Sequence, residues 1–205
     1  EYMIIFTQKN RLQFIFSTMS RLKITLSLVD IIFVLLLIIG FFIRLNGFYS
    51  ITYTEDGSRD FLVAHHIVKY HEFPSTGPAN SNYSPIKNSP LYFYFLSIFL
   101  LLKDSYMFLG FVNILLQLGT LILVYLLAKH MFGDATALIS SILFNFSQAI
   151  LIQSNFLWQP WISQPFANFS FFLLLLSYSQ KRYLFLNLGL FFYIISGVLH
   201  RSNFA

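Results

Sequence analysis

The chain has 205 residues, of which 57% are hydrophobic and only 10% are charged. A soluble domain carries about 25% charged residues, so the polar surface here is too small to cover a soluble globule, and the composition indicates an integral membrane protein. The formal net charge of +5 does not indicate nucleic-acid binding, because the 13 Lys and Arg residues are scattered at the ends of apolar segments and form no stripe.

Residues 1–23 carry four basic residues and are expected to form a cytoplasmic N-terminal segment. The first membrane-spanning helix is predicted at about 24–43, since about 20 apolar residues cross the hydrocarbon core. Arg44 follows at its external end, where it either snorkels to the surface or meets a lipid phosphate.

The stretch 52–96 concentrates polar chemistry, with four of the chain's eight acidic residues. A helix is predicted from Asp56 to about Tyr70, with Asp56 as its N-cap. Arg59 and Asp60 follow at i+3 and i+4, so the three side chains share one face. One interpretation is a general base, Asp56, steered by the arginine; the alternative is a helix cap with a local ion pair.

Three histidines and an acidic residue of this loop suggest a metal site, namely His65, His66, His71 and Glu72. The chain has no cysteine, so thiolate ligands are excluded. Adjacent histidines on a helix point about 100° apart and do not share one ion, which favours interfacial polar residues. A divalent metal bound by His71 or Glu72 remains open.

An aromatic run follows at 91–102, preceded by Pro90. Twelve residues are typical of an interfacial or re-entrant helix rather than a spanning one. The run is either an aromatic belt at headgroup level or a surface that guides a polyprenyl chain, and the two are compatible. Tyr92 and Tyr94 in this run, and Glu55 beside Asp56, are candidate substrate contacts.

Four further spanning helices are predicted, at about 106–128, 135–152, 166–179 and 183–199. If 91–102 does not cross, the positive-inside rule places Lys129 and Lys181–Arg182 in the cytoplasm and gives five spans in all.

This topology defines an external loop at 46–105 and a second one at 154–165, within a single membrane domain over 24–205. The chain stops directly after the last of these segments, and we expect it to be the N-terminal part of a longer protein.

Polar residues at membrane depth are expected to form interhelical hydrogen bonds; they are Asn113, Gln117, Asn145, Gln148 and Asn168. Gln159 in the second external loop is predicted on the same side of the membrane as Asp56, which makes it a candidate substrate contact.

Three stretches resemble a known class, namely TEDGSRDFLVAHHIV, SPLYFYFLSIFLLL and LILVYLLAKHMFGDATALISSILFNFSQAILIQSNFLWQP. The chain resembles the C-type (GT-C) integral-membrane glycosyltransferases, in particular the bacterial family related to protein O-mannosyltransferases and aminoarabinose transferases. The resemblance covers roughly residues 30–180, the N-terminal part of a typical member. It implies an all-α polytopic fold, a polyprenyl-phosphate-linked sugar donor, and transfer to an external lipid, glycan or protein acceptor.

The family's catalytic loop aspartate carries over to Asp56, and Asp56-x-x-Arg59-Asp60 looks like a variant of its motif. The sequence departs from the family's pattern at two places. Many members have an acidic residue and a Lys before Pro-Pro-Leu-Tyr, whereas here Lys87-Asn88-Ser89 precedes Pro90. In the second external loop, Gln159-Pro160 replaces the Asp-Pro of many members. Both departures weaken the case for a divalent metal and for an exact substrate, and a divalent metal stays possible.

We expect an inverting glycosyltransferase of the plasma membrane with an extracytoplasmic active face. Asp56 would be the base, and Arg59 or Arg44 would stabilise the leaving lipid phosphate. The rival is a non-enzymatic polytopic protein, such as a lipid-linked sugar flippase or a transporter fragment, whose ionisable residues should lie near the bilayer midplane.

Overall fold

The computed structural model describes residues 27–48, 53–78 and 88–200, and within them it holds helices and no strand. The helices are α2 (Leu28–Phe48), α3 (Glu55–Tyr70), α4 (Leu91–Leu100), α5 (Tyr106–Phe132), α6 (Asp134–Phe146), α7 (Gln148–Ser154), α8 (Gln159–Gln180) and α9 (Tyr183–Leu199). The chain divides into two units after Ile31, and of the first unit only residues 27–31 are described.

The first turn of α2 is fixed by a reciprocal cap. The backbone N–H and the hydroxyl of Ser27 both donate to Asp30 Oδ2, at 3.0 and 2.7 Å, while the Asp30 N–H donates to Ser27 Oγ. This is the capping-box arrangement, which satisfies N–H groups that have no partner inside the helix. Asp30 therefore has a local role at the start of α2.

Two helices, α2 and α5, are long and apolar enough to cross a membrane. The pair α6 and α7, bent by 59° at a break, would make a third if it counts as one span. The structure is thus all-helical in its described part, as predicted, and two or three of its helices are candidate spans where five were predicted.

The other two predicted spans correspond to α8 and α9, which are not among these candidates. Helix α8 is long enough, with 22 residues, but its first turns are polar and contain Pro160 and Pro165. Helix α9 has 17 residues, or about 26 Å at 1.5 Å per residue, against a hydrocarbon core of about 30 Å. Whether these two helices cross stays a prediction.

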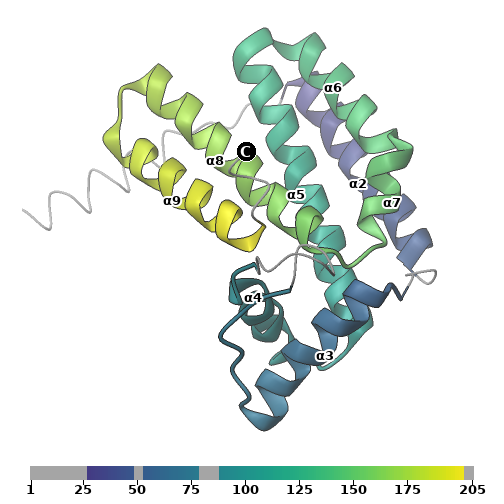
Figure 1. Cartoon of the computed structure of the whole chain (residues 1–205). Coiled ribbons are helices and arrows are strands. Elements are labelled where there is room, and N and C mark those ends of the chain that lie inside the picture. Colours follow the sequence, from purple (N-terminus) through teal and green to yellow (C-terminus); the bar gives the residue numbers. More distant parts are fainter. Residues whose placement is uncertain (1–26, 49–52, 79–87, 201–205) are drawn as a thin grey trace, which may run out of the picture. The chain divides into compact units, whose positions relative to one another are not determined.

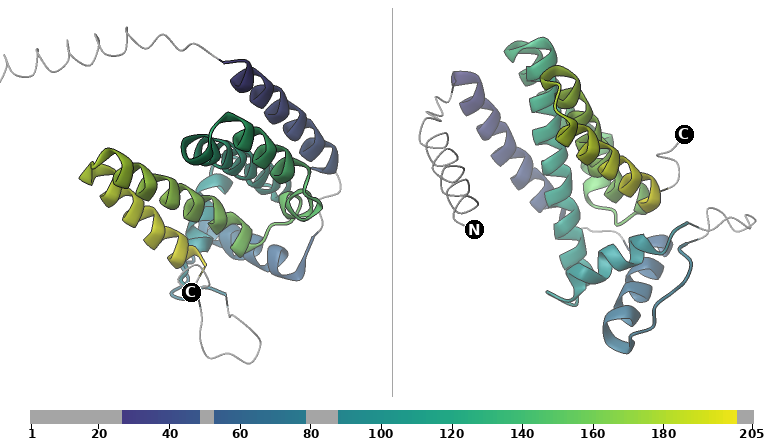
Figure 2. Two further views of the ribbon diagram at one scale, coloured as in Figure 1. Left: turned by 90° about the horizontal axis from the view of Figure 1, so that it is seen from above. Right: turned by 90° about the vertical axis from the view of Figure 1, so that its left-hand side faces the viewer.

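Within residues 32–205, α2, α5 and the α6–α7 pair run side by side, and α8 and α9 form a hairpin beside α5 (Figures 1 and 2). Phe33 of α2 stacks on Tyr125 of α5, with ring centroids 3.9 Å apart. The short helices α3 and α4 lie at one end of this bundle, where α2 and α9 end and α5 and α8 begin (Figure 1). The α5–α6 and α8–α9 turns lie at the opposite end.

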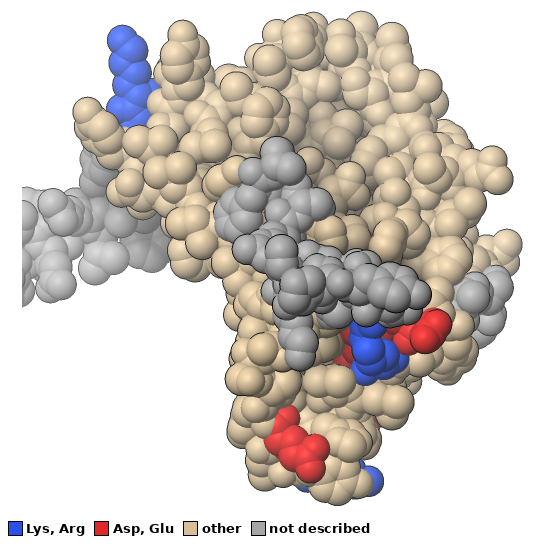
Figure 3. Space-filling view, viewed as in Figure 1, with Lys and Arg blue, Asp and Glu red and all other residues tan. Residues whose placement is uncertain are grey.

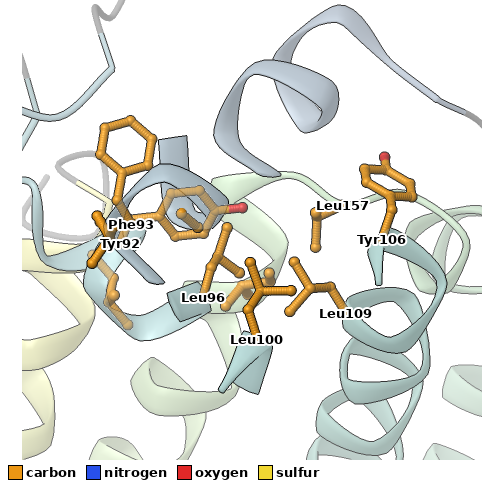
Figure 4. Close-up of a cluster of buried hydrophobic side chains, with 11 residues drawn as sticks. Tyr92, Phe93, Leu96, Leu100, Tyr106, Leu109 and Leu157 are labelled. Atoms are coloured by element: carbon orange, nitrogen blue, oxygen red, sulfur yellow. The ribbon is translucent and has the colours of Figure 1, made fainter. Parts of the chain in front are cut away.

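A hydrophobic core joins α3 and α4 to the bundle. Helix α3 turns Ala64 and Ile67 inwards, and α4 contributes four side chains spaced along one face. Figure 4 shows how Tyr92, Leu96 and Leu100 of α4 lie with Leu109 of α5 and with Leu157. The remaining members of the cluster are Phe93, Tyr106, Ile162 and Leu199.

Helix α4 is shorter than the aromatic run that predicted it, because it ends at Leu100. Ten residues rise about 15 Å, half of the hydrocarbon thickness. The length therefore agrees with a helix that does not cross, while its depth in a membrane stays a prediction.

Candidate functional site

Helix α3 begins at Glu55, one residue earlier than predicted, and its N-cap is Thr54 rather than Asp56. Thr54 Oγ1 accepts a hydrogen bond from the Gly57 N–H at 3.0 Å. The predicted cap role of Asp56 was therefore wrong. Because Thr54 already accepts from this N–H group, the Asp56 carboxylate is not needed as the cap and can bind other groups near the positive end of the helix dipole.

The same face of α3 carries a charge cluster. Arg59 donates from Nη1 to Asp56 Oδ1 at 2.7 Å, and from Nη2 to Asp60 Oδ1 at 2.7 Å. Its Nε also donates to Asp60 Oδ1, at 2.9 Å. The side chains of Arg59 and Asp56 are 44% and 50% exposed and that of Asp60 is 1% exposed, so the cluster runs from solvent into the protein.

Asp60 lies in an unusual environment for a carboxylate. Its Oδ2 is buried without a hydrogen-bond partner, and so is the hydroxyl of Tyr92 on α4. Burial raises the pKa of Asp60 to about 6 and outweighs the opposing effect of the Arg59 guanidinium. Burial, with the nearby Asp60 charge as a smaller cause, also raises the pKa of Tyr92 well above its ordinary value.

A pocket of about 210 Å³ opens beside Asp56. Thr54, Asp56 and three aromatic side chains line it. We call the three aromatic side chains the aromatic wall; they are Phe156, Trp158 and Trp161. The rings stand edge to face, with Trp161 centred 5.0 Å from Trp158 and 5.6 Å from Phe156.

Gly57 allows the start of α3 to approach the segment that carries the aromatic wall. A Cβ atom at this position would lie 2.6 Å from the Tyr106 hydroxyl and 2.7 Å from the Leu157 carbonyl oxygen. A larger residue would therefore push α3 away from residues 156–158. The pocket thus depends on the glycine that directly follows Asp56.

The other predicted substrate contacts do not line this pocket. Glu55 is exposed next to Asp56. Tyr92 is fully buried, and the Tyr94 hydroxyl donates to the Pro74 carbonyl at 2.6 Å. Gln159 is 4% exposed; it donates to the Leu199 carbonyl at the end of α9 and accepts from Asn88 Nδ2.

Arg44 is 1% exposed, so the expectation that it snorkels to the surface was wrong. Its guanidinium donates to Ser154 Oγ at 3.1 Å, to Asn145 Oδ1 at 2.7 Å and to the Gly40 carbonyl at 3.0 Å. Asn145 also occupies the space that a Cβ at Gly40 would need. Arg44 therefore joins α2 to both halves of the bent pair α6–α7.

The predicted interhelical hydrogen bonds are present for three of the five residues. Asn145 of α6 donates to the Leu36 carbonyl of α2, and Asn113 and Gln117 of α5 donate to backbone carbonyls between 153 and 161. Gln148 is exposed in the first turn of α7, and Asn168 is half-buried on α8.

The loop histidines form pairs with carboxylates. His65 Nδ1 lies 2.8 Å from Asp104 Oδ1, and His66 Nδ1 lies 3.0 Å from Glu72 Oε2. His71 ends α3 in the left-handed conformation. Among the described residues, no group of three His, Asp or Glu side chains is arranged to hold a metal ion.

On the visible face, acidic and basic side chains adjoin over α3, and basic side chains lie at the turn between α8 and α9 (Figure 3). The sequence predicts the charge cluster of α3 but the aromatic wall was not predicted. Its signal in the sequence is the pair Trp158 and Trp161, the only tryptophans of the chain, which flank Gln159.

Comparisons with protein-family models, with curated proteins and with solved structures found no match for this chain.

Proposed function

We propose that the chain is a membrane glycosyltransferase, or its N-terminal part, that moves a sugar from a polyprenyl-phosphate donor to an extracytoplasmic acceptor. The observation that carries the proposal is the Asp56 carboxylate at the edge of a pocket with an aromatic wall. A sugar ring has an apolar C–H face that packs against aromatic rings, and hydroxyl groups that a carboxylate accepts from. The pocket offers both surfaces to one ring.

In the proposed reaction, Asp56 accepts the proton of the acceptor hydroxyl as its oxygen bonds to the anomeric carbon. The bond from that carbon to the donor phosphate breaks, and its electron pair leaves with the lipid phosphate. Displacement from the opposite side inverts the anomeric centre. The Asp56 carboxylate is half-exposed and lines the pocket, so it can reach an acceptor hydroxyl there, as a general base must.

Arg59 would stabilise the leaving phosphate. Its guanidinium already binds two carboxylates, and it is 44% exposed on the Asp56 side. Replacing the Asp56 contact with a phosphate contact leaves the two bonds to the buried Asp60 in place. Arg44, which is buried and bonded to three neutral groups, is a weaker candidate for this task.

The test is sugar transfer in nanodiscs from a synthetic polyprenyl-phosphate sugar, with the full-length protein. Asp56→Asn should lower turnover by about 10²–10⁴-fold, the usual contribution of a general base, and leave thermal stability unchanged because Thr54 caps the helix. Glu72→Gln is the control, an exposed carboxylate of the same loop outside the pocket. Near-normal turnover of Asp56→Asn would refute the assignment of the base.

One observation favours the alternative of a lipid-linked sugar flippase or transporter. Arg44 is a buried cation on a candidate span, its partners among the described residues include no carboxylate, and it lies beside a helix pair broken at Ser147. Intramembrane charges and broken helices are typical of transport sites. Flipping of a fluorescent lipid-linked sugar in proteoliposomes, lost in Arg44→Met and kept in Asp56→Asn, would support this alternative.

A further inference from the structure

The segment 153–161, which carries the aromatic wall, contains a break between two helices, and local N–H groups pair only part of its carbonyls: the Gln153 carbonyl accepts from the Phe156 N–H at 3.4 Å. Helix α7 ends at Ser154 and α8 begins at Gln159. The last carbonyls of a helix have no partner inside it. A carbonyl that is buried away from water and left unpaired costs about 1–3 kcal/mol.

Asn113 of α5 donates hydrogen bonds to carbonyls at the end of α7 and just after it. Its side chain is fully buried, and Nδ2 lies 3.0, 3.2 and 3.0 Å from the carbonyl oxygens of Gln153, Ser154 and Phe156. Two amide hydrogens thus serve three carbonyls at the break between the helices. One of the three belongs to Phe156, a residue of the aromatic wall.

Gln117, one turn further along α5, donates a hydrogen bond to a carbonyl in the first turn of α8. Its Nε2 donates to the Trp161 carbonyl at 3.2 Å. In an uninterrupted helix that carbonyl would accept from the N–H four residues later, but that residue is Pro165, which has no N–H. Gln117 therefore completes the hydrogen bond that Pro165 removes, at a second residue of the aromatic wall.

We propose that Asn113 and Gln117 are positioning residues that hold the aromatic wall against Asp56. They act from a candidate membrane span on backbone carbonyls, and they touch neither the pocket nor its contents. Arg44 adds a contact to Ser154 from the other side, through α2. The consequence for sugar transfer rests on the proposed function, whereas the placement of the wall does not.

The chain offers a direct reporter, because both of its tryptophans belong to the aromatic wall. The experiment measures tryptophan emission and acrylamide quenching of the full chain in nanodiscs, without any sugar ligand. Gln117→Leu and Asn113→Leu should shift the emission maximum to the red and raise the quenching constant, because a released wall opens towards water. Repeating Gln117→Leu in a Trp158→Phe background assigns the change to Trp161.

Thr120→Val is the matched control. Thr120 is fully buried on the same helix, but its hydroxyl donates only to the Leu116 carbonyl of its own helix. Emission and quenching of Gln117→Leu identical to those of Thr120→Val, at equal helix content by circular dichroism, would overturn the proposal. This comparison decides the matter even if Asn113→Leu does not fold, because Gln117→Leu removes a single hydrogen bond.

A transfer assay separates this proposal from the proposed function. If the wild-type protein transfers no sugar but Gln117→Leu moves the tryptophan signal, the function fails and the positioning role stands. If the wild-type protein transfers sugar and the signal of Gln117→Leu is unchanged, only the positioning role fails.

Discussion

Asp56 and Asp60 share the guanidinium of Arg59 but differ in their surroundings. Asp56 is half-exposed, whereas the side chain of Asp60 is buried against α4 with one oxygen that has no hydrogen bond. Two carboxylates that face different environments are suited to different roles. In the proposed function, proton acceptance belongs to the exposed one and the placement of Arg59 to the buried one.

This difference predicts a pH dependence of stability. The folded pKa of Asp60 is raised to about 6, above its unfolded value of about 3.9. The folded state therefore binds the proton more tightly than the unfolded state, and stability increases as pH falls from about 6 to about 4. The shift of about two units corresponds to roughly 3 kcal/mol of destabilisation above pH 6.

Asp60→Asn should remove this component, since the amide does not titrate and its oxygen still accepts from Arg59. Melting curves followed by circular dichroism between pH 4.5 and 7.5 would measure it. The groups that face Asp60, namely Arg59, Asp56, Tyr92 and Tyr106, stay in place in both proteins. A variant with the same pH dependence as the wild-type protein would show that Asp60 is not the titrating group.

At the scale of elements, the proline inside α8 makes that helix dependent on α5. Pro165 leaves the Trp161 carbonyl without its helical partner, and Gln117 replaces it. The two residues should therefore be coupled in stability, although no side-chain hydrogen bond joins them.

Pro165→Ala restores the N–H that the Trp161 carbonyl needs. In the wild-type background, Gln117→Leu should cost about 1–3 kcal/mol, because it leaves a buried carbonyl unpaired. In the Pro165→Ala background the same substitution should cost clearly less. A double-mutant cycle of thermal unfolding measures the coupling, and equal costs in the two backgrounds would contradict it.

For the whole molecule, two turns that carry basic residues lie at the same end of the bundle. Lys129 and Asp134 form an ion pair at 3.3 Å at the α5–α6 turn, and Lys181–Arg182 connects α8 to α9. Both turns lie at the end of the bundle opposite to α3 and α4 (Figures 1 and 2). The membrane faces themselves stay a prediction, as does the crossing of α8 and α9.

Single-cysteine labelling tests this topology, and the chain has no cysteine of its own. Ser75, Asp134 and Ser179 are exposed positions in three different connections or helix ends. In intact cells, an impermeant maleimide should label Ser75→Cys, and should label Asp134→Cys and Ser179→Cys only after permeabilisation. Labelling of Ser179→Cys from outside would show that the α8–α9 hairpin does not cross as predicted.

The sequence by itself determined the features that depend on local chemistry. Apolar run length predicts α2 and α5, the short aromatic run predicts α4, and i, i+3 spacing predicts the contact of Arg59 with Asp56. These properties arise within one helix, so periodicity and length are sufficient to find them. The contact between the adjacent residues Arg59 and Asp60 does not follow from the spacing. Comparable reasoning places the end of α3 before Pro74.

Only the tertiary structure decided which distant groups meet. Gln159 was expected at the substrate, but it is buried between Asn88 and the end of α9; Arg44 was expected at the surface, but it binds across a bend at Ser147. A buried polar side chain must find hydrogen-bond partners, which are side chains or unpaired backbone groups of other helices. The positions of these partners depend on where other helices end or bend, and the residues next to the polar side chain in the sequence do not reveal this.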